Sequence, residues 1–186
     1  MIENIIQIDK DILIYLNNLG SEQWDSLWLI ITNQFSWAPL FLLVFYLVIK
    51  NFGWKRGGFA ILSMIVLVAF SDQFTNFIKN SVQRLRPNND PEIMHLLRTL
   101  KDPQSYSFMS GHATTSTFFS VFVILLLRDK MKYIYFMVGF PLIFAYSRLY
   151  LGVHFPIDIL VGLLIGTILA RLYYLLYTKV DQKIFS

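Results

Sequence analysis

The sequence has no cysteine, and charged residues make up only 15% of its 186 positions, against about 25% in a typical soluble domain. The missing cysteines exclude disulfides and thiolate chemistry, and they leave the redox compartment undetermined. The net charge of +4 is too small to indicate nucleic acid as a partner. Hydrophobic residues reach 55% and occur in long blocks, which is typical of an integral membrane protein.

Apolar stretches cover about 25–49, 57–79, the segment from just after His112 to Leu127, 133–151 and 156–177. Each approaches the ~20 residues needed to cross the hydrocarbon core. Asn33 and Gln34 interrupt the first stretch, and we expect Pro39 to kink it. The other connections between these stretches are short, and only the 80–111 connection is long.

Residues 4–19 carry an apolar helical stripe that Asp9, Lys10 and Asp11 interrupt. That pattern favours a helix lying at the membrane surface over a crossing. We therefore predict an all-α integral membrane bundle of five transmembrane helices plus this interfacial helix, with six crossings as the alternative. Residues 1–186 are expected to form a single domain, and no removable signal peptide is expected because a basic segment and cleavage site are missing.

Alternating crossings place the 50–56 loop, the 128–132 loop and the C-terminus on one side, and the 80–111 loop and His154 on the other. Lys and Arg predominate on the first side once Lys79, Arg86 and Arg148 are set aside for chemistry. The positive-inside rule then predicts that the first side is cytoplasmic and that the segment around His154 faces outward.

Three polar clusters stand at helix ends on that outward side. The second stretch ends in "KNSVQRLRP", the third follows "SFMSGHATTS", and "SRLYLGVHFPID" joins the fourth to the fifth. The predicted topology gathers the polar residues of these clusters at one membrane face, namely Lys79, Arg86, Ser110, His112, Arg148, His154 and Asp158.

Three cations beside a helix start suit a highly charged oxyanion such as phosphate. Ser110 is a good N-cap residue, and backbone amides near Gly111 can point at an anion. Arg84, Arg98 and Lys101 are interpreted as ordinary membrane-edge cations. Asp72, inside the second stretch, is costly in a membrane, so it is a candidate to support the site by pairing with a nearby basic residue.

The histidines offer acid–base and nucleophilic chemistry. His154 and Asp158 are four residues apart across a helix start, so the carboxylate can orient one ring nitrogen and leave the other free to attack. His112 can then protonate the leaving oxygen. A zinc site of His112, His154 and Asp158 is the alternative, and the neighbouring cations disfavour a dication there.

Together the three clusters resemble the type-2 phosphatidic acid phosphatase, or lipid phosphate phosphatase, superfamily over about residues 57–175. The matching positions are Lys79 to Arg86-Pro87, then Met109-Ser110-Gly111-His112, then Ser147-Arg148 with His154 and Asp158. Met109 stands where the family usually has Pro, and residues 4–19 replace the usual first crossing.

The resemblance implies a role for each matching residue. His154 would be the nucleophile that forms a phosphohistidine, Asp158 would orient it, and His112 would protonate the leaving group and later help to activate water. The phosphate would be held by Lys79, Arg86, Ser110, Gly111 and Arg148. The family needs no metal or other cofactor.

The implied function is a metal-independent phosphatase of a membrane lipid phosphate or pyrophosphate, at the outer face of a bacterial-type inner membrane. Undecaprenyl pyrophosphate is the first choice, with phosphatidylglycerophosphate and lipid A as alternatives. A phospholipid-phosphate binding or transport protein would not need both histidines and Asp158. Vanadate-dependent peroxidase chemistry, known from related soluble enzymes, fits membrane spans poorly. No obligate protein partner is inferred, and head-group preference and oligomeric state are left open.

Overall fold

The computed structural model describes residues 2–185, which form helices joined by turns and loops. The α-helices are α1 (Ile2–Asn18), α2 (Glu22–Ile31), α3 (Ala38–Val82), α4 (Gly111–Leu127), α5 (Gly139–Tyr150) and α6 (Pro156–Phe185). Short 3-10 helices lie at η1 (Gln34–Trp37), η2 (Pro87–Asn89), η3 (Met94–Leu96) and η4 (Lys132–Val138). No strand occurs between residues 2 and 185, and the predicted all-α class is confirmed.

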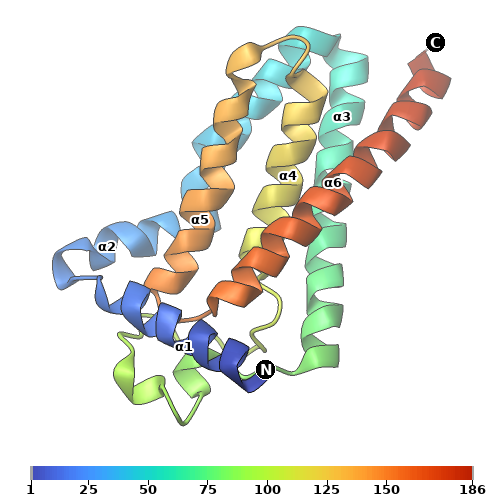
Figure 1. Cartoon of the computed structure of the whole chain (residues 1–186). Helices are drawn as coiled ribbons and strands as arrows, with labels where there is room; N and C mark the ends of the chain where they lie inside the picture. The colour runs from blue at the N-terminus through green and yellow to red at the C-terminus, as the bar shows by residue number, and fades with distance from the viewer. Residues whose placement is uncertain (1, 186) are drawn as a thin grey trace.

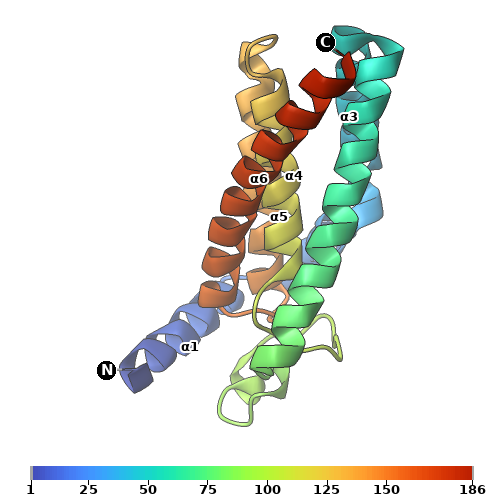
Figure 2. The same cartoon turned by 90° about the vertical axis from the view of Figure 1, so that its right-hand side faces the viewer.

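Helix α3 is a hairpin of two helical arms (Figures 1 and 2). Gly53 breaks it with φ 73° and ψ 173°, a conformation that glycine adopts without the Cβ clash of other residues. The two arms, α4, the η4–α5 segment and α6 then run alternately up and down the molecule (Figure 1). The three polar clusters therefore share one end, as predicted.

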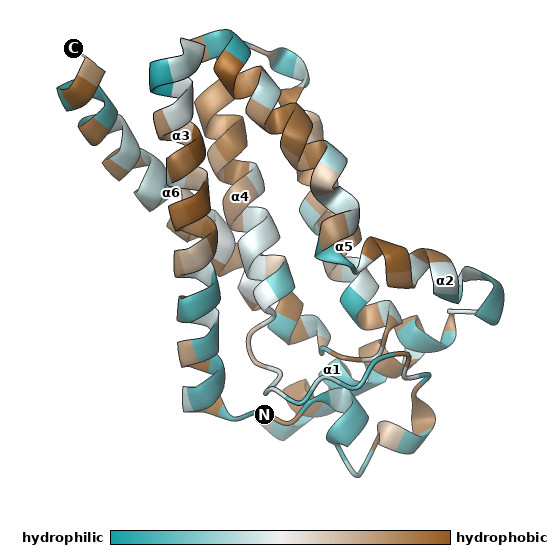
Figure 3. Cartoon of the chain, turned by 180° about the vertical axis from the view of Figure 1, so that it is seen from behind, coloured by the Kyte–Doolittle hydropathy of each residue, from teal (hydrophilic) through white to brown (hydrophobic). Residues whose placement is uncertain are grey.

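The membrane prediction is supported by the outer surface of the helices. Large apolar side chains such as Leu42, Leu62, Leu164 and Leu172 are exposed, and Figure 3 shows that hydrophobic residues occupy much of the length of the bundle helices. An exposed apolar surface of this kind suits a lipid environment. By length and hydropathy, two helical segments, Gln34–Asn89 and Pro156–Phe185, are sufficient to cross a membrane, so the number of five crossings stays a prediction.

The first predicted apolar stretch, 25–49, is not one helix. Helix α2 ends at Ile31, the Asn33 side chain accepts a hydrogen bond from the Phe35 amide at 3.1 Å, and α3 starts only at Ala38. Local hydrogen bonding by asparagine competes with the helix and breaks it. Pro39 lies in the first turn of α3, where proline is tolerated, and does not kink it.

Helix α1 lies across the end of the bundle that holds the polar clusters (Figures 1 and 2). Leu13 and the polar Asp9 and Asn17 are buried, whereas apolar side chains on another face are exposed, namely Ile5, Ile8, Ile12, Tyr15 and Leu19. A helix that docks by one face and exposes an apolar stripe agrees with the interfacial position predicted for residues 4–19.

Close packing of α4 against α6 brings together the N-termini of these two helices, which carry two of the polar clusters. A Cβ at Gly166 would lie 2.6 Å from the Thr114 carbonyl oxygen, and one at Gly162 would lie 3.0 Å from that of Ser110. These glycines let the backbones approach more closely than any larger residue would allow. The start of α6 consequently lies beside Ser110.

Candidate active site

His154 lies in the connection between α5 and α6, and Asp158 lies in the first turn of α6. The Phe155 amide, just before the helix, donates to Asp158 Oδ2 at 3.0 Å, which is half of a capping box. The same Oδ2 is 3.4 Å from His154 Nδ1. The single Asp158 carboxylate therefore caps α6 and faces the His154 imidazole at the same time, and both side chains are buried.

The other ring nitrogen of His154 faces Arg86. Arg86 Nη1 is 3.2 Å from Nε2, and a guanidinium can only donate, so Nε2 must be the acceptor. The proton of the neutral ring therefore lies on Nδ1, toward Asp158. Burial lowers the pKa of His154 well below its usual range, and nearby Arg86 and Arg148 lower it further, against the opposing effect of Asp158. A neutral imidazole with its Nε2 lone pair among cations can act as a nucleophile toward phosphorus.

Asp158 receives two further side-chain donors. Arg84 Nη1 donates to Oδ1 at 2.8 Å, and Ser107 Oγ donates to Oδ2. The interpretation of Arg84 as an ordinary membrane-edge cation is therefore wrong, because its guanidinium points inward. Its Nη2 also donates to Asp9 on α1 at 2.7 Å.

Arg86 is fixed by the loop that follows it and by the α5–α6 connection. Its Nη2 donates to Ser105 Oγ at 2.9 Å, and its Nη1 donates to the Val153 carbonyl at 2.8 Å. Burial lowers the pKa of Arg86 to about 10, which leaves it cationic at neutral pH. These bonds hold a positive charge against His154 Nε2.

Helix α4 starts at the same place. Ser110 is its N-cap, as predicted, and accepts from the Ala113 amide at 3.4 Å. The Ser110 amide donates to the Asp158 carbonyl at 3.1 Å, which joins the second and third clusters. A Cβ at Gly111 would be 3.3 Å from Thr75 Oγ1, so α4 starts close to α3. The partly exposed His112 ring lies 5.0 Å from that of Phe144.

Lys79 and Arg148 complete the cluster from the last turns of α3 and α5. Both are buried, with exposed fractions of 8% and 5%. Arg148 Nη1 donates to Thr32 Oγ1 at the end of α2, and its buried Nε has no hydrogen-bond partner in the described part of the chain. An unpartnered buried donor of this kind is available to a ligand oxygen.

The three predicted phosphate-binding cations share an unusual property. Within residues 2–185, no carboxylate pairs with Lys79, Arg86 or Arg148, although other cations at this end do have such partners. Buried charges without counter-ions are costly. The cluster therefore has the electrostatics of an anion site.

Among residues 2–185, the side chain of Asp72 forms no hydrogen bond or ion pair with the cluster. It is exposed, its carboxylate accepts from Asn76 at 3.2 Å, and it forms no ion pair with any residue in the described part of the chain. The expected pairing with a basic residue is therefore not formed, but its negative charge acts on Lys79 at longer range, so its supporting role stays a prediction. Arg98 pairs with Asp25 at 2.9 Å, and Lys101 is exposed, so neither enters the site.

Sequence reasoning missed Thr32, Arg84 and Ser107, whose side chains contact the predicted set, and Asp9, which contacts Arg84. Of these residues, only Asp9 could have been found from the sequence pattern. It lies one helical turn before Leu13 and therefore on the docking face of the 4–19 helix. For the other three, residue type and spacing do not show which way the side chain points.

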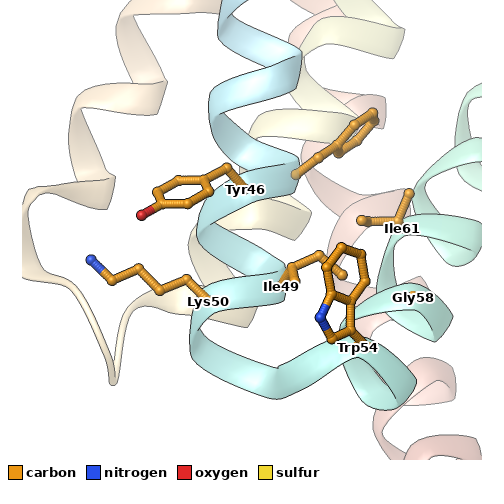
Figure 4. Close-up of a pocket in the computed structure, with 7 residues that line it drawn as sticks. Tyr46, Ile49, Lys50, Trp54, Gly58 and Ile61 are labelled. Carbon is orange, nitrogen blue, oxygen red and sulfur yellow. The ribbon is translucent and has the colours of Figure 1, made fainter.

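A cavity of about 620 Å³ lies away from this cluster, against the hairpin turn of α3 (Figure 4). It is almost wholly apolar and is lined by Phe45, Tyr46, Ile49, Lys50, Trp54, Gly58 and Ile61. It carries no acid–base pair, so the candidate active site is assigned to the polar cluster instead.

Comparison with known proteins identifies relatives over the whole chain. Residues 60–182 match the family model described as the PAP2 superfamily. A lipid A 4'-phosphatase of Bacteroides thetaiotaomicron is 32% identical over 100% of this chain and 84% of its own length. Another, of Porphyromonas gingivalis, is 25% identical over 94% of this chain and 75% of its own length.

The fold also has a solved counterpart. The crystal structure of a transmembrane PAP2-type phosphatidylglycerolphosphate phosphatase from Bacillus subtilis superposes with a TM-score of 0.73. It covers 97% of this chain and 88% of the other, at 21% identity. At that identity the likeness concerns the fold.

Proposed function

Because the chain belongs to the PAP2 superfamily, we propose that it is a membrane phosphatase that removes the 4'-phosphate of lipid A. The family and the enzyme class predicted from the sequence, a hydrolase of lipid phosphates, are confirmed. The observation that carries the proposal is the set of three buried cations, none paired with a carboxylate between residues 2 and 185, at the same end of the bundle as His154, whose imidazole Arg86 contacts.

The choice of lipid differs from the first choice made from sequence. Relatives that match 100% and 94% of the chain are lipid A 4'-phosphatases, which favours the alternative of lipid A over undecaprenyl pyrophosphate. The three motifs are compatible with either lipid, because they contact the phosphate that both head groups share.

In the first step, Arg86 moves its Nη1 from His154 Nε2 to a phosphate oxygen, with Lys79 and Arg148 on the others. Nε2 attacks phosphorus, the bond from phosphorus to the sugar oxygen breaks, and His112 gives that oxygen its proton. Asp158 accepts from Nδ1–H throughout and stabilises the positive charge that develops on the ring. Ser110 and the amides at Gly111 donate further hydrogen bonds to these phosphate oxygens at the start of α4.

In the second step, His112 takes a proton from water, whose oxygen attacks the phosphorus of the phosphohistidine. The phosphorus–nitrogen bond breaks, inorganic phosphate leaves, and His154 returns to its neutral form. Apart from the shift of Arg86, the groups that stabilise each charge change are already in place, so little reorganisation is required.

The site lies at the membrane surface in this proposal. The end of the molecule that carries α1 and the 83–110 loop faces outward from a bacterial-type inner membrane, and the ends with more Lys and Arg face the cytoplasm. The head group enters from that surface while the acyl chains stay between helices. The domain is the whole chain, since α1 and α2 supply contacts to Arg84 and Arg148.

Phosphate release tests the proposal. Purified protein in detergent, with a metal chelator present, is given lipid A, undecaprenyl pyrophosphate and phosphatidylglycerophosphate side by side. We expect the highest kcat/KM on lipid A, with 31P NMR showing loss of the 4'-phosphate while the 1-phosphate remains. Binding of all three lipids without phosphate release would instead indicate a binding or transport protein.

A further inference from the structure

A network behind Asp158 connects the predicted active site to helix α1. Arg84 uses its two terminal nitrogens on two carboxylates, with Nη1 2.8 Å from Asp158 Oδ1 and Nη2 2.7 Å from Asp9 Oδ2. Asp9 in turn accepts from the Ile157 amide at 2.9 Å, in the first turn of α6. Asp9 and Asp158 are 2% and 0% exposed, so they depend on these donors in place of water.

The orientation of Arg84 is fixed from two sides. Its guanidinium carbon lies 3.8 Å from the ring centroid of Phe155, the residue next to His154. Its carbonyl accepts from the Ser107 amide at 2.9 Å, and the Ser107 hydroxyl donates to Asp158. A planar fork can serve two carboxylates at once, which the single ammonium of lysine does less well.

We propose that Arg84 and Asp9 are positioning residues, which hold the Asp158 carboxylate aimed at His154 Nδ1, so that the site is complete only when α1 is docked. This inference rests on the proposed function, in which His154 is the nucleophile. Without Arg84, two buried carboxylates lose their shared counter-charge, and Asp158 is free to turn from the ring. Arg84 itself touches no substrate.

A purely structural role for this network is the competing explanation, and α1 offers a matched control. Lys10, the next residue, pairs with Asp90 at 2.8 Å and Glu92 at 2.6 Å, and so fastens α1 to the 83–110 loop without contacting Asp158. Lys10→Met weakens docking of α1 while leaving the contacts of Arg84 in place. Arg84→Gln removes the positioning charge.

Steady-state kinetics on lipid A separate the two explanations. We expect Arg84→Gln to lower kcat by about 10- to 100-fold with KM nearly unchanged, as for other residues that orient a reacting group. Arg84→Lys should recover part of the loss, and Asp9→Asn should cause a smaller fall that is absent in the Arg84→Gln background. Wild-type kcat in Arg84→Gln, or an equal fall in Lys10→Met, would overturn the proposal.

A spectroscopic readout keeps the test independent of the substrate. The 15N spectrum of His154 distinguishes the two neutral tautomers, and we expect the Nδ1–H form in the wild type and in Lys10→Met, but a mixture in Arg84→Gln and in Asp9→Asn. If the wild type releases no phosphate, the proposed function fails, and the tautomer comparison still decides the positioning role. An unchanged tautomer in Arg84→Gln would refute it.

Discussion

At the residue scale, the partners of a buried charge decide its role. Arg84 and Arg86 are two positions apart, and both guanidiniums point inward. Arg84 lies between two carboxylates, whereas Arg86 donates to neutral acceptors and to the imidazole of His154. The first is therefore neutralised within the protein, and the second keeps its charge for a ligand.

Arg148 provides a direct test of the anion site. Arg148→Ala should lower kcat/KM by about 10²–10³-fold, because a charge-assisted phosphate contact in a desolvated site is lost. The rate of phosphate release from lipid A gives kcat/KM for each variant. Arg128→Ala is the control, since Arg128 is half exposed and lies at the opposite end of α4. Equal activity of the two variants would remove Arg148 from the site.

The protonation state of His154 makes a prediction about pH. Since burial lowers its pKa in the folded protein, the ring should stay neutral as the pH falls from 8 to about 6, where an exposed histidine titrates. The unfolded chain binds that proton near its ordinary pKa, so this residue contributes stability that is lost as the pH falls below about 6.5. A 15N NMR titration measures the protonation state of the His154 ring in the folded protein, with His154→Gln used to assign its signals. An imidazolium signal from folded His154 at pH 6 would contradict the account.

At the element scale, the helix ends carry the chemistry and the glycines set their spacing. Four helix termini, the ends of α3 and α5 and the starts of α4 and α6, bring their polar residues together because α3 folds back at Gly53 and α6 packs tightly on α4. The motifs at these termini were predictable from sequence. The interruption at Asn33 and Gln34 was visible in the sequence, but 25–49 was treated as one stretch with a kink at Pro39, because apolar residues resume beyond Gln34 and only the local hydrogen bonds show that the helix ends there.

The α4–α6 contact predicts opposite effects for two glycines. In Gly166→Ala the new methyl group would lie 2.6 Å from the Thr114 carbonyl oxygen, so the helices must separate at a cost of about 1–3 kcal/mol. Gly58→Ala meets nothing within 4 Å and should stabilise α3 by up to about 1 kcal/mol. Thermal unfolding in detergent measures both, and an unchanged midpoint for Gly166→Ala would argue against the close packing.

At the scale of the whole molecule, the fold class, the grouping of the three clusters and the family were predictable, because hydropathy and motif spacing are local properties of the chain. The roles of Asp9, Thr32 and Asp72 were not. Asp9 meets Arg84, and Thr32 meets Arg148, across 75 and 116 positions of sequence, and such contacts depend on the packing of whole helices. Asp72 has the same charge as Asp9, yet its side chain points outward.

The predicted orientation is testable because the chain has no native cysteine. Lys101 lies in the loop at the end with the active site, and Lys130 lies in the loop at the opposite end, and both are exposed. In intact cells, a membrane-impermeant maleimide should label Lys101→Cys and should label Lys130→Cys only after lysis. The reverse pattern would place the active site on the cytoplasmic side.

The central claim is that His154 takes the phosphate from the lipid. Rapid quenching of wild-type protein with lipid A, followed by mass spectrometry under conditions that preserve phosphoramidate, tests it most directly. The account predicts a phosphoryl group on the peptide that contains His154, and none in the His154→Ala protein, which should also release no phosphate. Turnover by His154→Ala, or a phosphoryl group found on another residue, would contradict it.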